Sequence, residues 1–132
     1  MFKLFENEMK NKIFLCIFVI FFCGASYADW VLVINDTKGQ FLIENVAIKR
    51  ENSNREYWGL QNLRIPNGNT KSAKALHKVD CLTGTTEILY LSGHSELDGG
   101  GARVFEAIPP GLFFTAKEKP ELAPATSFVC AR

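Results

Sequence analysis

Residues 70–81, TKSAKALHKVDC, decide the fold, because two different periodicities run through them. Three basic residues have the spacing of one face of a helix: Lys71, Lys74 and Lys78. Every second residue has the spacing of one face of a strand: Ala73, Ala75, His77, Val79 and Cys81. Periodicity alone leaves both alternatives open, so the choice depends on the rest of the chain.

Cys81, the last residue of this stretch, has three possible roles: a nucleophilic thiol, a metal ligand or one half of a disulfide. The compartment in which the chain folds decides among them. Disulfides persist in oxidising compartments and are rare in the cytosol. The sequence N-terminal to this stretch indicates the compartment.

Residues 9–30, MKNKIFLCIFVIFFCGASYADW, have the pattern of a secretory signal peptide. Lys10 and Lys12 form its basic start, and an apolar run follows that is about half as long as the roughly 20 residues of a membrane-spanning helix. The eight residues before it include two glutamates where positive charge is typical. We therefore expect an export signal whose true start is Met9.

The end of the signal has the small side chains that a signal peptidase accepts, at Ser26 and Ala28. Cleavage is expected between Ala28 and Asp29. The chain then consists of a signal peptide, residues 1–28, and a single domain, residues 29–132, with no membrane anchor after cleavage. A mature chain of roughly 100 residues can build one modest core.

Neither cysteine of the signal has the small preceding residue that a lipid-anchor signal requires. Cys16 follows Leu15, and Cys23 follows Phe22. The sequence therefore predicts a periplasmic or secreted protein and argues against lipid-anchored surface display.

Cleavage also makes the chain nearly neutral. It removes three of the 15 Lys and Arg residues and two of the 14 Asp and Glu residues. A nucleic-acid partner requires a clustered excess of positive charge. We therefore expect no nucleic-acid partner.

The mature chain keeps two cysteines, Cys81 and Cys130. In an oxidising compartment, two cysteines in a small domain usually pair. In the chain-entropy model, a disulfide that closes a loop of about fifty residues stabilises the folded state by about 4 kcal/mol. The whole free energy of unfolding of a small domain is roughly 5 to 15 kcal/mol. A disulfide between them is thus a large part of the expected stability.

Short β-branched and aromatic runs separated by turn residues predict an antiparallel sheet of about six strands. Besides the ambiguous stretch, these runs are residues 30–35, 40–44, 46–50, 56–61, 85–96 and 102–108. The tail predicts a short helix that begins near Pro124 and is anchored by Phe128 and Val129. The predicted fold class is α+β.

A series of short motifs resembles the surface-adhesin protein E family over nearly the whole mature chain. The motifs are Trp30, YWGL (57–60), KSAK (71–74) leading to VDC (79–81), LSG (91–93), Gly101 and the terminal FVC (128–130). The resemblance implies an antiparallel sheet with a C-terminal helix tied to it by a disulfide, at Cys81 and Cys130 here. It also favours strand over helix for the stretch that ends in Cys81.

The resemblance has two departures. The adhesin that gives the family its name resembles a surface lipoprotein, whereas this chain has no acylation signal. Pro124 also lies in the segment where the family has a longer helix, and residues 109–120, PPGLFFTAKEKP, resemble an altered connection before it.

Catalytic residues are not predicted. The residue types of a nucleophilic triad are present in His77, His94, Ser92 and Asp98. The serine, however, lacks a strained elbow such as G-x-S-x-G. The sequence therefore favours a protein that is not an enzyme.

No metal or other cofactor is predicted either. His77 and Cys81 share a strand face but are about 13 Å apart along it, too far for one metal ion. DGGGAR, residues 98–103, lacks the Lys and Ser or Thr of a phosphate-binding loop and is interpreted as a turn.

Tyr57 and Trp58 are adjacent, so in a strand one faces the core and the other faces outward. The outward aromatic is a candidate contact residue, since such side chains are enriched at interfaces. The three lysines of residues 70–81 are interpreted as a solvated edge strand, where lysine discourages sheet-to-sheet pairing.

The sequence thus predicts an exported, non-catalytic binding protein of the bacterial cell envelope whose ligand it does not identify. The expected partner is a protein of the envelope or of a host matrix. The alternative is an inhibitor or regulator of an envelope enzyme, in which the loop HSELDGGG, residues 94–101, occupies a cleft of the target.

Overall fold

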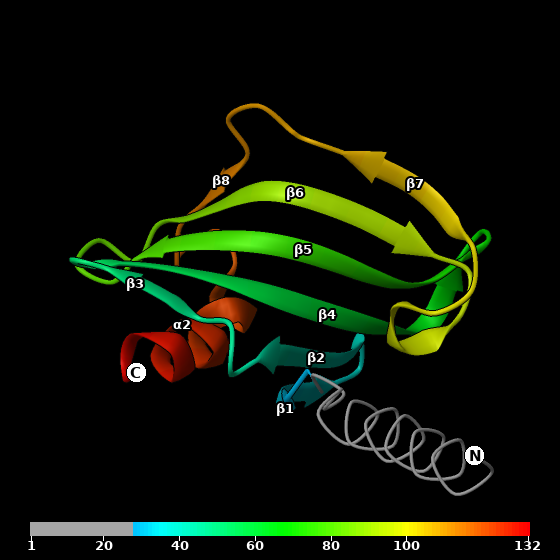
Figure 1. The fold of residues 1–132 in the computed structure, drawn as a ribbon, viewed down its shortest axis with the longest axis horizontal. Coiled ribbons are helices and arrows are strands. Elements are labelled where there is room, and N and C mark those ends of the chain that lie inside the picture. Colours follow the sequence, from blue (N-terminus) through cyan, green and yellow to red (C-terminus); the bar gives the residue numbers. More distant parts are fainter. Residues whose placement is uncertain (1–27) are drawn as a thin grey trace, which may run out of the picture.

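The computed structural model describes residues 28–132, which form one curved antiparallel sheet and a short C-terminal helix (Figure 1). The sheet has eight strands, two more than about six. They are β1 (Trp30–Asp36), β2 (Gly39–Glu44), β3 (Lys49–Glu51), β4 (Asn54–Asn67), β5 (Thr70–Asp80), β6 (Thr86–His94), β7 (Arg103–Ala107) and β8 (Phe113–Phe114). The predicted α+β class is confirmed.

The main path of the sheet is β1-β2-β4-β5-β6-β7, with β3 paired to β4 and β8 paired to β6. The sequence did not predict β8, whose two residues are too few to show a pattern. The strand predicted over residues 46–50 begins only at Lys49. Val46 before it is exposed and belongs to the connection.

Residues 70–80 form a strand, so the choice left open by periodicity is settled. Strand β5 pairs with β4 on one side and β6 on the other. The interpretation of its lysines as an edge is therefore wrong. Lys74 and Lys78 instead alternate with buried residues and lie on the face of the sheet opposite the helix.

The helix α2 (Ala123–Cys130) covers one face of the sheet and forms the core with it. Ile43, Tyr57 and Val79 contribute from β2, β4 and β5. Ala125 and Val129 contribute from the helix, and both are fully buried. We call this side the helix face and the other side the open face.

The helix begins where the sequence predicted, with Pro124 in its first turn, where a missing N–H costs nothing. Val129 is a core anchor as expected. Phe128 is only half-buried, and the Arg132 guanidinium lies 3.7 Å from its ring centroid. Phe128 nevertheless packs against the core as predicted, and Ala125 is a further buried residue of the helix that the sequence did not identify.

The disulfide Cys81–Cys130 joins the residue after β5 to the last residue of the helix, with the two Cα atoms 5.8 Å apart. The predicted tie between sheet and helix is confirmed. The predicted signal peptide lies almost wholly outside the described residues. Within residues 28–132, no helix is both long enough and apolar enough to cross a membrane.

Candidate functional site

The open face carries a row of large side chains that the helix α2 does not cover. Strand register places Trp58 opposite Leu76, and Leu76 opposite Tyr90, so the three side chains share this face. The rings of Trp58 and Tyr90 meet edge to face with centroids 5.7 Å apart. All three side chains are half-buried.

A second indole extends the row across the sheet. Trp30 lies opposite Glu44 at the end of β1, and the Lys74 Nζ is 5.8 Å from the centroid of the Trp30 ring. Trp30, Glu44, Trp58 and Lys74 together line an open hollow of about 220 Å³, which we call the indole pocket. It combines two aromatic walls with one carboxylate and one ammonium group.

The prediction for the adjacent aromatic pair is confirmed. Tyr57 is 1% exposed on the helix face, whereas Trp58 lies on the open face. Sequence reasoning did not identify the other members of the indole pocket. Trp30 and Lys74 are 44 positions apart in the chain, and their contact depends on the register of four strands.

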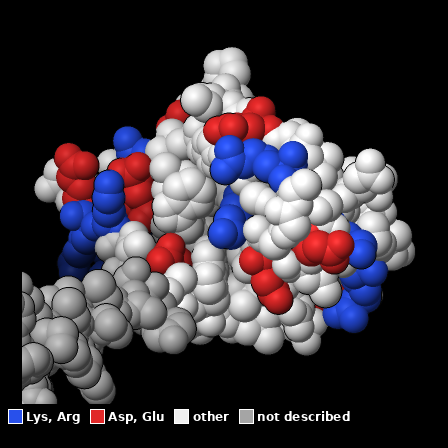
Figure 2. Space-filling view, turned by 45° about the vertical axis from the view of Figure 1, so that its right-hand side comes forward, with Lys and Arg blue, Asp and Glu red and all other residues white. Residues whose placement is uncertain are grey.

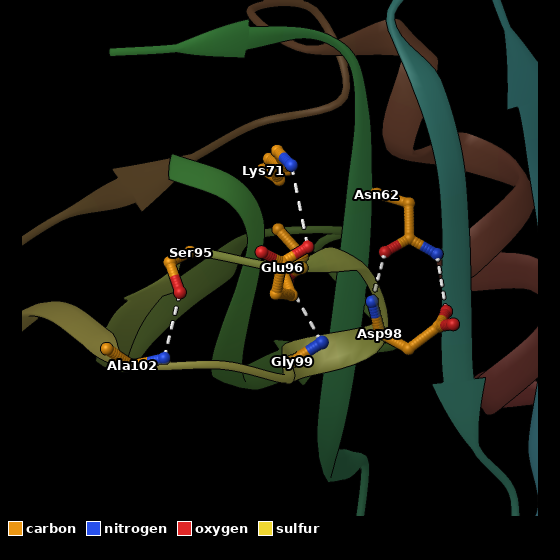
Figure 3. Close-up of polar contacts among 8 residues, drawn as sticks. Asn62, Lys71, Ser95, Glu96, Asp98, Gly99 and Ala102 are labelled. Carbon is orange, nitrogen blue, oxygen red and sulfur yellow. Dashed lines mark hydrogen bonds and ion pairs between the residues drawn. The ribbon is translucent and has the colours of Figure 1, made fainter. Parts of the chain in front are cut away.

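The connection between β6 and β7 lies across one end of the open face (Figure 3). It contains the 3-10 turn η1 (Leu97–Gly99), in which Asp98 has a φ of 60°. We call residues 95–102 the cap loop. In Figure 1 it is the yellow segment at the end of β4 and β5, away from the helix.

Two side chains of the sheet hold the cap loop. The Asn62 amide donates to Asp98 Oδ1 at 2.8 Å and accepts from the Asp98 backbone N–H at 2.8 Å. The Ser72 hydroxyl donates to the Glu96 carbonyl at 2.6 Å and accepts from the Gly99 N–H at 2.9 Å. The loop is therefore fixed to the sheet rather than projecting freely from it.

The loop also closes on itself, as the Ser95 hydroxyl accepts from the Ala102 N–H at 2.8 Å. Lys71 and Glu96 form an ion pair at 3.4 Å on its exposed side. Leu97, 52% exposed, is its largest apolar side chain in contact with solvent. The predicted glycine turn at residues 98–101 is thus part of a longer, internally bonded loop.

The four triad-type residues do not assemble into a triad. Ser92 and His94 do meet, with Oγ and Nε2 2.9 Å apart, but Ser92 is only 3% exposed. Asp98 is bound to Asn62 instead of His94. Strand alternation puts His77 on the helix face, away from the other three.

Cys81 is in the disulfide, so its sulfur is not available as a metal ligand beside His77. Nowhere in residues 28–132 do three His, Cys, Asp or Glu residues gather as metal ligands. His77 is 4% exposed, and burial lowers its pKa from 6.5 to about 4. It is a neutral core residue at pH 7.

Charges of both signs are interspersed on the face of the molecule that Figure 2 shows. The ion pairs Arg103–Glu106 and Lys71–Glu96 show this mixture beside the cap loop. A surface of this kind has no strong field of one sign and does not favour a polyanion.

The whole described domain matches one family model, Surface-adhesin protein E, over residues 30–131. No curated protein matches the chain in sequence. The fold is similar to that of protein E of Haemophilus influenzae in several crystal structures. Crystal form II has 15% identity and a TM-score of 0.57 over 82% of this chain and 94% of that chain.

Two further structures of protein E have the same fold. The selenomethionine form has 13% identity and a TM-score of 0.59 over 83% of this chain and 94% of that chain. The protein from a non-typeable Haemophilus influenzae has 14% identity and a TM-score of 0.57 over 80% of this chain and 77% of that chain. At such low identity the likeness concerns the fold alone.

Proposed function

Because the chain belongs to the surface-adhesin protein E family, we propose that it is an exported, non-catalytic binding protein of the bacterial cell envelope. The indole pocket on the open face is its contact site. The observation that carries this proposal is that Trp30, Trp58 and Tyr90 lie on a sheet face that the helix leaves free. Trp and Tyr are enriched among the few residues that carry most of the binding energy of protein interfaces.

The ligand class that suits this surface is a protein. The pocket offers Glu44 and Lys74 beside its two aromatic walls, so it can pair with charges of either sign while burying apolar area. The cap loop extends the same surface with exposed Leu97. The partner is therefore an envelope or host-matrix protein, in keeping with the name of the family.

The absence of catalysis is part of the proposal. Ser92 is the one hydroxyl near a histidine in the triad-type set, and it is buried where a substrate cannot reach it. A catalytic His also needs an orienting acid, and Asp98 is committed to Asn62. Removal of residues 1–28 and a periplasmic or secreted location complete the proposal.

The test uses the mature domain, residues 29–132, as bait in an envelope extract, followed by affinity measurement with the captured protein. Trp58→Ala is expected to weaken that affinity at least tenfold, about 1.4 kcal/mol. Leu82→Ala is the matched control, because Leu82 is 85% exposed and lies outside the indole pocket. Equal affinity of wild type and Trp58→Ala would refute the assignment of the pocket.

The cap loop favours a second candidate function, the inhibitor or regulator of an envelope enzyme. The loop is held in one conformation before any partner binds, which lowers the entropy lost on binding. Deleting it would expose the buried Ser72, so a single substitution at its tip is the cleaner test. If this function is right, Leu97→Ala weakens capture and Trp58→Ala does not.

A further inference from the structure

The helix face has a cavity of about 240 Å³ beside the helix, and neither the proposed function nor the core uses it. The helix α2 has eight residues and packs mainly on β1 and β4. Residues 112–122, which include β8, lead from the edge of β6 to the helix. We call this segment the strap and the hollow beneath it the strap cavity.

The floor of the cavity consists of small residues on neighbouring strands. Gly59 lies opposite Ala75, and Ala73 follows on the same face. A Cβ added at Gly59 would lie 2.6 Å from the Phe41 ring and 2.8 Å from His77 Cε1, so a larger residue does not fit. Gly59 therefore makes room for the Phe41 and His77 rings, which lie over it and line the cavity as well.

The walls are apolar except for Gln61. Ile88 and Leu91 come from β6, and Leu112, Phe114 and Leu122 come from the strap. His77 is the titratable group of the floor, and it stays neutral at pH 7 because burial lowers its pKa to about 4. The His77 Nδ1–H donates a hydrogen bond to the Ala75 carbonyl oxygen, 3.1 Å away. The interior thus suits an uncharged, apolar body.

The rim carries a lysine whose charge is only partly balanced, because the neighbouring Glu121 interacts with Lys38 as well as with Lys119. Lys119 and Glu121 both line the rim, but Glu121 pairs with Lys38 at 3.3 Å. Within the described part of the chain, Lys119 forms no ion pair. Its Nζ lies 4.7 Å from the centroid of the Phe114 ring, directly at the strap.

We propose that the strap cavity binds a small monocarboxylate, with its aliphatic or aromatic body against Ala73 and Ala75 and its carboxylate at Lys119. The volume of about 240 Å³ exceeds the roughly 150 Å³ of a protein cavity that binds benzene, and is below the 300 Å³ at which pockets for drug-sized ligands begin. A two-chain lipid is too large. The site is on the opposite face from the indole pocket, so it does not depend on the proposed function.

Sodium hexanoate and 1-hexanol are matched probes, since they share the carbon chain and differ in charge. Titration of the 15N-labelled mature domain at pH 7 is expected to give saturable shifts at Ala73, Ala75 and Phe114. Hexanoate should bind more tightly than hexanol. Lys119→Gln is expected to raise the dissociation constant of hexanoate at least threefold, while that of hexanol stays unchanged.

The controls separate the charge from the cavity. Lys119→Arg should retain hexanoate binding, and Lys117→Gln, at an exposed position outside the cavity, should have no effect. Ala73→Leu fills the floor and should weaken both probes. The proposal is overturned if the shifts do not saturate, if they map to the indole pocket, or if Lys119→Gln binds hexanoate as wild type does.

Discussion

Tyr57 and His77 stack face to face across strands β4 and β5, with ring centroids 4.8 Å apart and ring planes 5° apart. They are register partners, and Phe41 meets the His77 ring edge-on at 5.7 Å. Both stacked residues are buried, and burial raises the pKa of the Tyr57 hydroxyl while it lowers that of His77. The core beside the helix is thus built around a histidine that folds in its neutral form.

This stack predicts a loss of stability in acid. The pKa of His77 is about 4 in the folded protein against 6.5 for the free group, so below pH 6.5 the unfolded chain binds a proton that the folded chain does not. The free energy of unfolding is therefore complete above pH 6.5 and falls as the pH drops toward 4. The full loss is about 3 kcal/mol, measurable by urea denaturation at a series of pH values.

The variant His77→Leu cannot titrate and should lose most of this pH dependence, whatever its stability at pH 7. His94 is the comparison, because desolvation and the charges of Lys74 and Arg103 lower its pKa as well. His94→Gln should leave the larger part of the slope in place. A wild-type slope that survives in His77→Leu would contradict the assignment.

The disulfide predicts a second measurable loss. Cys81 and Cys130 are 49 positions apart, and the chain-entropy model gives about 4 kcal/mol for a loop of that size, an upper figure because residual structure in the unfolded state reduces it. The double variant Cys81→Ala/Cys130→Ala is expected to retain the sheet and to exchange its amide hydrogens quickly in residues 123–132. Hydrogen exchange measured by mass spectrometry would show it.

The control for this prediction is wild type treated with a reducing agent, which should match the variant. Ala125 and Val129 are fully buried and retain some helix packing, so the loss should stay below the full entropic figure. Fast exchange spread over the whole sheet would show that the disulfide supports more than the tail.

Maturation gives a third prediction. Ser26 and Ala28 are small enough for signal peptidase, so the exported protein should begin at Asp29. Intact-mass measurement of protein isolated from the cell envelope checks this. A mass that includes an acyl group on Cys23 would contradict it and indicate a lipid-anchored protein.

Sequence patterns predicted the fold more completely than the candidate sites, and the reason is physical. The alternation through His77 and Val79 is local information that predicts a strand and the face of it that is buried. The two mature cysteines predict the disulfide in the same way. The indole pocket joins Trp30 to Lys74 across strands whose register the sequence does not reveal. The strap cavity depends on which small residues face the same side, which again is a matter of register.

The sequence also did not reveal that β5 lies between two other strands of the sheet. Lysines at positions 71, 74 and 78 are typical of an exposed edge, but here Lys74 lies over an indole and beside Gly99 of the cap loop. A long aliphatic stem allows lysine to cover an apolar surface while its charge stays in water. Charge pattern alone did not distinguish an edge strand from a central strand with one open face.

The cap loop gives the last prediction, because Asn62 and Ser72 hold the same segment by separate hydrogen bonds. Asn62→Ala leaves the Asp98 N–H without its partner, and Ser72→Ala does the same to the Gly99 N–H. Each change removes two hydrogen bonds of a partly buried segment and should cost about 1 to 3 kcal/mol, at about 0.5 to 1.5 kcal/mol for each bond.

The two losses should not add. Once either side chain is removed, the loop loosens, so the other side chain contributes less to stability. The loss of unfolding free energy in the double variant should therefore be smaller than the sum of the two single losses. The expected difference is at least about 0.5 kcal/mol, the lower end of the range of about 0.5 to 3 kcal/mol seen for coupled residues. Ser127→Ala and Asn67→Ala, at exposed positions, are the matched controls and should change stability little. Urea denaturation of the four proteins of the cycle measures the coupling. Strict additivity would mean that the two anchors hold independent parts of the loop, and hydrogen exchange at Gly99 and Ala102 would then respond to one substitution each.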